Sequence, residues 1–270
     1  MASVAHVNRP IPLVMGVINV TEDSFFEGSR ALTTADAVSL GRSMAAQGAT
    51  FVDVGGESSR PGATPVALDV ELDRVIPVIE ELAGTVPVSV DTVKAEVARA
   101  AVAAGATLIN DVGGQLAQVA AELGVGWVAM HAKGEPATMQ DDPRYDDVVE
   151  EVASWLEAAA DIAAGLGIAD LWLDPGIGFG KTFEHNWTLL RHTDRFAALA
   201  HAKGARLLVG TSRKRFLGEV GGTGLDPADR LAASLATALA AMVGGADMVR
   251  VHDVKPTCDA ARLLAEEMAA

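Results

Sequence analysis

The chain has 270 residues, of which 50% are hydrophobic and 21% are charged, and its formal net charge at pH 7 is -15. This apolar content is sufficient for a large core and excludes a disordered chain. The negative charge argues against nucleic-acid binding, which relies on attraction to phosphates, so any anionic ligand needs a local cluster of basic residues. The length exceeds that of a typical single domain but fits an α/β barrel.

Cys258 is the only cysteine, so the chain can form no internal disulfide, as is typical of proteins in the reducing cytosol. The first residues lack a charged region followed by an apolar stretch and a cleavage site, and the next apolar run is broken at Asn19 after about ten residues. We therefore expect a cytoplasmic protein with no signal peptide and no membrane span. We also expect an N-terminal extension, 1–11, before one folded domain, 12–270.

Eight short runs rich in Val, Leu and Ile alternate with eight alanine-rich amphipathic segments. The expected strands are 13–18, 50–54, 86–90, 107–111, 126–130, 171–175, 206–210 and 247–251. The expected helices are 34–47, 67–82, 94–105, 116–123, 145–165, 186–200, 226–245 and 257–268. Strands that are apolar throughout are buried on both faces, as in a parallel sheet covered by helices. Eight such units predict an α/β fold, a single-domain (β/α)₈ TIM barrel.

Other glycine-rich and metal-binding patterns are absent or incomplete. A doubly wound sheet is the alternative fold, but no glycine-rich dinucleotide turn follows the first strand. The segment "GIGFGKT" is similar to a P-loop, yet only three residues separate Gly176 from Gly180, where that motif requires four. No HExxH motif and no cysteine pair is present, so we expect no transition metal held by the protein alone.

Polar residues lie at the ends of all eight expected strands or just after them, where a (β/α)₈ barrel carries its active site. They are Asn19, Asp53, Asp91, Asn110 with Asp111, His131, Asp174, 212–215, and Arg250 with His252. A single acid at a strand end is often only a helix cap. Lysine, arginine and histidine do not cap helix N-termini, so the whole set indicates a binding site.

Six basic residues follow three strands of this acidic chain: Arg60, Arg213, Lys214, Arg215, Arg250 and His252. Guanidinium groups and an imidazole suit a phosphate or diphosphate, and the loops after strands seven and eight of a barrel often bind one. The alternative is that these residues are solvated loop charges.

Three further strand ends carry Asp91, Asn110 and Asp174. A carboxylate can accept two parallel hydrogen bonds, and an amide can donate and accept at once, so together they suit a planar heterocycle with adjacent N–H donors. The alternative is that they cap helices or support other residues.

Eight motifs, within a resemblance that runs from about residue 12 to about residue 261, resemble those of the dihydropteroate synthase family of folate biosynthesis, the target of sulfonamides. They are "VMGVINVTEDSF", "VDVGGESSRPGA", "VSVDT", "INDVGG", "MHAKGEPATMQ", "LDPGIGFGKTFEHN", "VGTSRKRFLG" and "RVHDV". The resemblance implies a (β/α)₈ barrel, usually a homodimer, with Mg²⁺ as cofactor. The implied reaction condenses 6-hydroxymethyl-7,8-dihydropterin diphosphate with p-aminobenzoate to give dihydropteroate and diphosphate.

The resemblance also implies a role for individual residues. It places the pterin on Asp91, Asn110, Asp174, Gly178 and Lys214. It places the diphosphate on Asn19, Ser59, Arg60, Arg250 and His252, with Asn19 also a metal ligand. It places p-aminobenzoate on Phe25, Pro61, Phe179, Ser212 and Lys214. The expected catalytic residues are Asp23, Lys214, Arg250 and His252, with Asp23 stabilising a carbocation.

The loop after the first strand departs from the family pattern. Glu22 replaces a proline and Phe26 replaces a serine, which puts the response to sulfonamides in question rather than catalysis. We interpret its acids and phenylalanines as a lid over a cationic intermediate. Two alternative functions are a methyltetrahydrofolate-dependent methyltransferase, which has no need of a diphosphate cluster, and a non-catalytic pterin-binding paralogue.

Overall fold

A computed structural model describes residues 11–21, 33–58, 65–134, 138–222 and 224–269. Its eight strands are β1 (Leu13–Asn19), β2 (Phe51–Gly55), β3 (Val88–Asp91), β4 (Leu108–Val112), β5 (Gly126–Met130), β6 (Leu171–Asp174), β7 (Arg206–Val209) and β8 (Met248–Val251). They form a closed parallel barrel in chain order, and β8 pairs with β1 from Leu13 opposite Met248 to Gly16 opposite Val251. The predicted (β/α)₈ barrel is confirmed. Of the expected extension, 1–11, only residue 11 is described.

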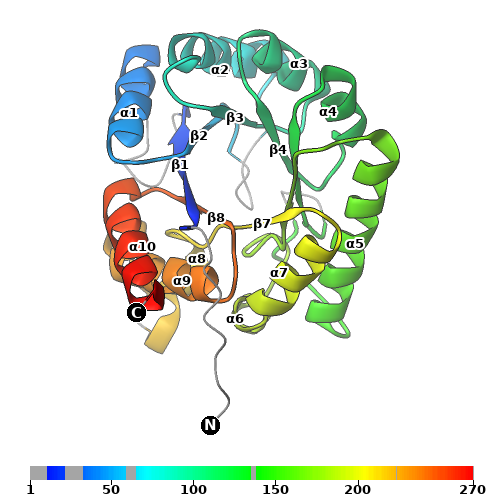
Figure 1. The fold of residues 1–270 in the computed structure, drawn as a ribbon, viewed down its shortest axis with the longest axis vertical. Helices are drawn as coiled ribbons and strands as arrows, with labels where there is room; N and C mark the ends of the chain where they lie inside the picture. The colour runs from blue at the N-terminus through cyan, green and yellow to red at the C-terminus, as the bar shows by residue number, and fades with distance from the viewer. Residues whose placement is uncertain (1–10, 22–32, 59–64, 135–137, 223, 270) are drawn as a thin grey trace.

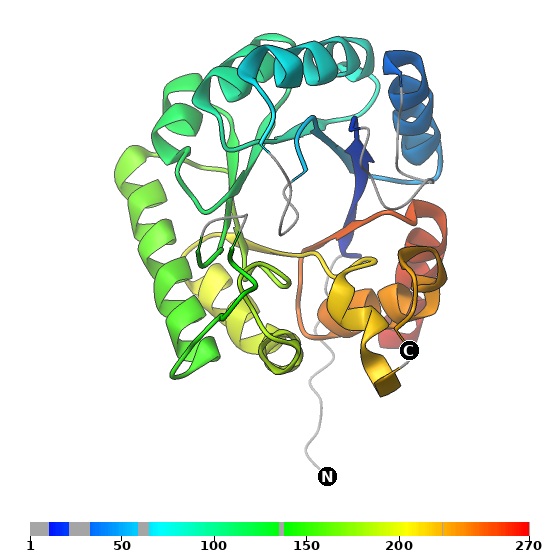
Figure 2. The ribbon, with the colours of Figure 1, turned by 180° about the vertical axis from the view of Figure 1, so that it is seen from behind.

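The helices form a ring outside the strands (Figures 1 and 2). They are α1 (Thr34–Ala46), α2 (Leu68–Leu82), α3 (Ala95–Ala103), α4 (Ala117–Leu123), α5 (Val148–Leu166), α6 (Phe183–Arg191), α7 (Thr193–Ala202), α8 (Arg215–Gly218), α9 (Leu231–Val243) and α10 (Val254–Ala269). Two short 3₁₀ helices, Val220–Gly222 and Pro227–Asp229, lie between α8 and α9. Within the described ranges, no helix combines the length and the apolar character that crossing a membrane requires.

Local side-chain hydrogen bonds define where several helices begin. Thr33 accepts a hydrogen bond from the backbone N–H of Asp36 at the start of α1, and Asp147 accepts two at the start of α5. At α6, Thr182 and His185 form a reciprocal capping box. Such caps satisfy N–H groups that have no partner within the helix.

Two predicted helices differ from the structure. The expected helix 186–200 is divided at His192 into α6 and α7. The hydroxyl of Thr193 donates to the carbonyl of Leu190 at 2.7 Å, and the His192 ring lies 2.8 Å from the carbonyl of Thr188. These side chains compete with the helical hydrogen bonds.

The expected helix 226–245 begins only at Leu231. Its first predicted turn is the 3₁₀ helix Pro227–Asp229, and the carbonyls of Pro227 and Ala228 accept hydrogen bonds from Arg213. A tertiary contact therefore decides this boundary.

An apolar layer fills the barrel away from the carboxyl ends of its strands. It consists of Met15, Leu108, Val128, Trp172, Leu208 and Met248, all fully buried. The larger core lies between the barrel and the helices. The strand residues that follow this layer are polar and buried, among them Asp53, Ser89 and Asn110. Polar chemistry is therefore confined to the carboxyl end of the barrel, as expected for this fold.

Candidate active site

A cavity of about 790 Å³ lies at the carboxyl ends of the strands. The described residues predicted for the site that line it are Asn19, Gly178, Phe179, Ser212, Arg213, Lys214, Arg215, Arg250 and His252. Asp91, Asn110 and Asp174 are nearly fully buried and do not belong to this lining. The predictions for Asp23, Phe25, Ser59, Arg60 and Pro61, and those for Glu22 and Phe26, lie outside the described residues.

Arg250 connects the cavity to the buried carboxylates. Its Nε donates to Oδ2 of Asp53 at 2.6 Å, and its Nη2 donates to Oδ2 of Asp91 at 2.8 Å. The amide of Asn110 also donates to Oδ2 of Asp53, at 2.9 Å. Strands β2, β3, β4 and β8 thus share one polar network across the barrel.

Asp53 is a residue to which the sequence analysis assigned no role beyond its place at a strand end. It is fully buried, and its Oδ1, like Oδ1 of Asn110, has no hydrogen-bond partner within the described part of the chain. Buried acceptors without a partner are costly in a folded protein and often lie where a ligand or water binds. The sequence itself indicates a role for Asp53, because an acid in an otherwise apolar strand requires a partner for its charge.

Burial shifts the ionisation of the site residues. It raises the pKa of Asp91 to about 7, although the Arg250 guanidinium opposes the shift. It also raises the pKa of Asp174 above its usual value, with Lys214 opposing. Burial lowers the pKa of Lys214 to about 8, while the nearby Asp174 favours the charged form. Lys214 therefore remains mainly cationic at neutral pH, close to two carboxylates.

The segment "GIGFGKT", rejected above as a P-loop, is the loop between β6 and α6. Gly176 has a φ of +65°, and a Cβ there would lie 1.7 Å from the carbonyl oxygen of His131. Gly180 has a φ of +64°, and a Cβ there would lie 2.1 Å from the carbonyl oxygen of Lys133. The glycines thus allow this loop to pack against the backbone that follows β5, with no role in binding a nucleotide.

Lys181 supports the backbone of the loop between β6 and α6. Its Nζ donates to the carbonyls of Gly176 at 2.9 Å and Phe179 at 3.1 Å, and lies 2.9 Å from Nδ1 of His131. Burial lowers the pKa of Lys181 well below its usual value and lowers the pKa of His131 to about 3. Burial thus disfavours the charged forms of both bases, and Nζ of Lys181 supports the loop by its hydrogen bonds to two carbonyls.

Other side chains hold the remaining polar groups of the same loop. Asn186 accepts a hydrogen bond from the N–H of Gly178 at 2.6 Å, Gln140 donates to the carbonyl of Gly178 at 2.6 Å, and Lys214 donates to the carbonyl of Ile177. The backbone of this loop is consequently held by several side-chain hydrogen bonds. It presents Phe179, whose ring lies 4.7 Å from Nζ of Lys214.

Phe179 belongs to an apolar cluster with Val112, Met130 and Met139. These residues come from the ends of β4 and β5 and from the loops that follow β5 and β6. Apart from Phe179, none of them was predicted for the site, because apolar residues at strand ends cannot be distinguished from core residues in a sequence. They provide an apolar wall beside the polar groups, as binding sites for flat ligands require.

Ser212 and His252 contact each other from the loops after β7 and β8. The hydroxyl of Ser212 accepts the backbone N–H of His252 at 3.2 Å and lies 3.1 Å from Nδ1 of the ring. The serine hydroxyl can donate its proton to Nδ1 or accept one from it. In the first case Nε2 of His252, a residue that lines the cavity, is the N–H donor of the ring.

The basic residues of "SRKR" separate into three environments. Only Lys214 lies beside the buried acids of the barrel. Arg213 lines the cavity but is buried, and its guanidinium is bonded to Asp253. Arg215 also lines the cavity, is exposed and pairs with Glu219 one helical turn later.

Comparison with known proteins identifies the family. The model of the pterin binding enzyme family matches residues 15–252. The chain is 44% identical to a dihydropteroate synthase of Escherichia coli K12 over 268 residues, covering 96% of this chain and 93% of that protein. The chain belongs to the pterin-binding enzyme family, among its dihydropteroate synthases.

Solved structures of the family have the same fold. A Yersinia pestis dihydropteroate synthase in complex with a sulfonamide drug matches with a TM-score of 0.89 and 40% identity, over 96% of this chain and 95% of that chain. A Xanthomonas albilineans dihydropteroate synthase in complex with 7,8-dihydropteroate matches with a TM-score of 0.83 and 43% identity, over 96% and 94% of the two chains.

Proposed function

We propose that this protein is an active dihydropteroate synthase that condenses 6-hydroxymethyl-7,8-dihydropterin diphosphate with p-aminobenzoate. The observation that carries the proposal is the juxtaposition of buried carboxylates with Lys214, Arg250 and His252 at the carboxyl end of the barrel. This combination suits a substrate with a hydrogen-bonding heterocycle at one end and an anionic leaving group at the other.

The pterin is proposed to lie on Asp91, Asn110 and Asp174. Asp91 uses Oδ2 for Arg250, and Oδ1 of Asn110 has no partner among the described residues, so acceptors remain for the N–H groups of an aminopyrimidine. Phe179 and the apolar residues around it supply a surface for the flat ring. Gly178 allows the side chain of Lys214 to approach the loop closely, because a Cβ at this position would lie 3.0 Å from that side chain.

The diphosphate is proposed to lie toward Arg250 and His252, with Ser59 and Arg60 as further predicted contacts. Among the described residues, no three His, Cys, Asp or Glu side chains are grouped to hold a metal ion. Asn19 lines the cavity and offers one neutral oxygen, which fits Mg²⁺, an ion that takes few protein ligands and completes its shell with substrate phosphates and water. When bound, Mg²⁺ would neutralise charge that develops on the leaving group.

The p-aminobenzoate is proposed to lie against Phe179, Ser212 and Lys214, with Phe25 and Pro61 as further predicted contacts. The cation of Lys214 suits the carboxylate of p-aminobenzoate, and Ser212 lines the same cavity. The structure of the Xanthomonas albilineans relative contains 7,8-dihydropteroate, which joins both substrates in one molecule.

In the proposed reaction the bond between the pterin CH₂ and the diphosphate oxygen breaks, the amine nitrogen forms a bond to that carbon, and the amine loses one proton. The electron-rich ring shares the positive charge, so the substitution is dissociative. Arg250 and His252 stabilise the departing diphosphate, an electrostatic role in which one donor is worth on the order of 3 kcal/mol. Asp23 is the predicted carboxylate near the cation. The amine is already a neutral nucleophile, so positioning supplies most of the remaining effect.

The alternatives are less well supported. A methyltetrahydrofolate-dependent methyltransferase does not need a diphosphate site, and the relatives at 44% identity are dihydropteroate synthases. A non-catalytic paralogue is disfavoured because Asn19, Asp91, Asn110, Asp174, Lys214, Arg250 and His252 are all present.

Turnover tests the proposal directly. We expect purified protein with the pterin diphosphate, p-aminobenzoate and Mg²⁺ to release diphosphate and form dihydropteroate, measured by a coupled diphosphate assay and by chromatography. Folded protein that forms no product under these conditions would refute the proposed activity.

Lys214→Ala tests the cation of the site. Because Lys214 lies among Asp91, Asp174 and the ring of Phe179, we expect kcat/KM to fall by about 100-fold, the size of one electrostatic contact of about 3 kcal/mol. The control is Lys255→Ala, an exposed lysine on α10 that pairs with Asp259. Equal activity of the two variants would remove Lys214 from the mechanism.

The pKa of Asp91, about 7, predicts a pH dependence of pterin binding. Above pH 7 the ionised carboxylate accepts N–H donors, and below it the protonated form accepts fewer, so the dissociation constant rises by up to about tenfold per pH unit as pH falls. Fluorescence titration with 6-hydroxymethylpterin between pH 5.5 and 7.5 measures it. Asp91→Asn should flatten the profile; an unchanged slope would assign the titration to another group.

We also propose that the protein is a cytoplasmic homodimer. Along α9 the exposed residues Leu231, Ala232, Ala236, Ala240 and Val243 are all apolar, and the helix contains no charged residue. An apolar face of this kind is typical of an oligomer interface. The buried, unpaired Cys258 fits a reducing compartment.

Ala236→Lys tests the dimer by placing a charge on this face. We expect it to shift the mass measured by light scattering from dimer to monomer, because an unpaired charge is costly in an apolar interface. Ala158→Lys, at an exposed position of α5, is the control and should leave the mass unchanged. A wild-type protein that is monomeric at micromolar concentration would contradict the proposal.

A further inference from the structure

Arg213 lies between two proposed site residues, Ser212 and Lys214, yet its side chain serves another purpose. Its φ of +57° is the only positive φ of a non-glycine residue within the described ranges. A left-handed backbone is unfavourable for a residue with a long side chain and persists only where surrounding contacts hold it. The contacts of Arg213 should therefore account for this conformation.

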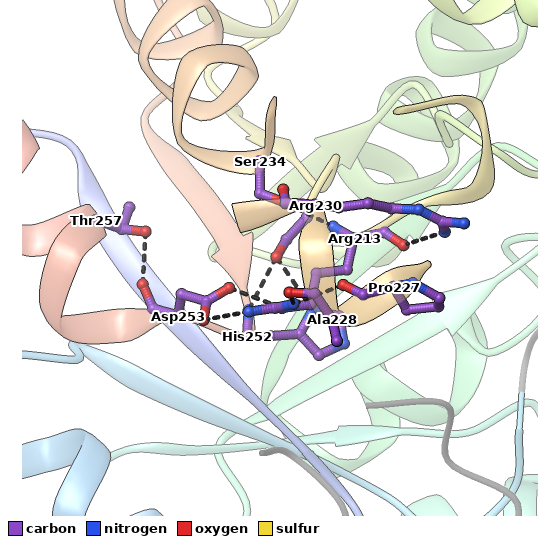
Figure 3. Close-up of polar contacts among 9 residues, drawn as sticks. Arg213, Pro227, Ala228, Arg230, Ser234, His252, Asp253 and Thr257 are labelled. Carbon is purple, nitrogen blue, oxygen red and sulfur yellow. Dashed lines mark hydrogen bonds and ion pairs between the residues drawn. The ribbon is translucent and has the colours of Figure 1, made fainter. Parts of the chain in front are cut away.

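The side chain of Arg213 forms a bidentate ion pair with Asp253 (Figure 3). Nε lies 2.8 Å from Oδ2 and Nη2 lies 2.7 Å from Oδ1, and the two side chains are only 5% and 16% exposed. Nη1 donates to the carbonyls of Pro227 at 2.6 Å and Ala228 at 3.0 Å. A guanidinium with this geometry is an internal brace and is not available to an anionic ligand.

The backbone of Arg213 is held on both sides as well. Its N–H donates to the hydroxyl of Ser234 at 2.9 Å, and that hydroxyl donates to the carbonyl of Arg230 at 2.7 Å. Its carbonyl accepts Nη1 of Arg230 at 3.0 Å. Figure 3 shows these contacts around Arg213, with His252 beside the ion pair. The peptide at Arg213 is thus fixed to the start of α9.

The partners of the ion pair are sequence neighbours of site residues. Ser212 and Lys214 flank Arg213, and His252 precedes Asp253. Asp253 is itself anchored, because its carbonyl accepts the hydroxyl of Thr257 at 2.7 Å in the first turn of α10. A change in the distance between Arg213 and Asp253 would therefore separate Ser212 from His252, which now contact each other.

We propose that Arg213 is a positioning residue: its ion pair with Asp253 holds the loop after β7 against the loop after β8, so that Ser212, Lys214 and His252 face the cavity together. This inference rests on the proposed function for the roles of those three residues. Asp91, Asn110 and Asp174 lie on β3, β4 and β6, outside the two loops that the ion pair joins, so they depend on it only through Arg250 and Lys214.

Arg213→Lys is the decisive variant. Lysine keeps the charge and meets the same backbone conformation, but one ammonium cannot replace the two parallel hydrogen bonds and the two carbonyl contacts. We expect KM for p-aminobenzoate and for the pterin diphosphate to rise by about 10- to 100-fold, the effect of a small displacement of positioning groups. The dissociation constant of 6-hydroxymethylpterin, which lacks the diphosphate, should rise much less than these KM values, because Asp91, Asn110 and Asp174 are retained even though Lys214 is displaced.

Arg195→Lys is the matched control. Arg195 also forms a bidentate pair, with Glu150 at 2.5 Å for each contact, but this pair lies exposed between α5 and α7. All kinetic constants of this variant should equal those of the wild type.

Calorimetric titration with inorganic diphosphate makes the test independent of turnover. Weaker diphosphate binding in Arg213→Lys, with a much smaller change in 6-hydroxymethylpterin binding, supports the positioning role. It does so even if the wild type forms no product, a result that would refute only the proposed reaction. The positioning role would be overturned if KM values and diphosphate affinity were unchanged while the melting temperature fell. It would also be overturned if pterin affinity fell as much as diphosphate affinity. If Arg213→Lys does not fold, Asp253→Asn, which keeps the shape of the partner, is measured with the same criteria.

Discussion

Closure of the parallel barrel is the constraint on which the rest of this structure depends. The pairing of β8 with β1 brings all eight strand ends to one rim, although the residues involved are spread from Asn19 to His252. The apolar layer around Trp172 and Met248 then blocks the interior from the other side. Polar side chains that follow this layer can reach solvent or a ligand only on the side of the cavity. They must therefore either pair with each other or bind a ligand.

The same constraint explains how an acidic protein holds an anionic substrate. Four basic side chains are placed near the cavity by different means and have different roles. Arg250 is paired with Asp53 and Asp91, and Lys214 lies near Asp91 and Asp174. Lys181 supports the backbone of a loop, and Arg213 is bonded to Asp253. Burial with specific partners, rather than net charge, decides which of them can meet a ligand.

The loops at the rim are held by side chains whose polar groups bond to the loop backbone or to each other. Lys181 and Asn186 fix the loop after β6, and Arg213 and Ser234 fix the loop after β7. Such support is what keeps catalytic groups in place when they lie on loops rather than on strands. It also gives a physical reason for two motifs, "GFGKT" and "TSRKR", in which only some residues point toward the substrate site.

The sequence by itself determined the barrel and the family, because buried parallel strands are continuously apolar and the eight motifs are specific. It also indicated the polar strand ends, including Asp91, Asn110 and Asp174. It did not predict the break at His192, the late start of α9 or the apolar wall at Met130 and Met139, since these depend on local competition or on tertiary packing. Only the tertiary structure decided that Lys214 lies beside the buried acids while its neighbour Arg213 bonds to Asp253, and that Arg250 meets Asp53 across the barrel. The physical reason is that a side chain's direction follows from its backbone conformation and from partners far away in the chain, and neither is encoded in the local pattern of residues.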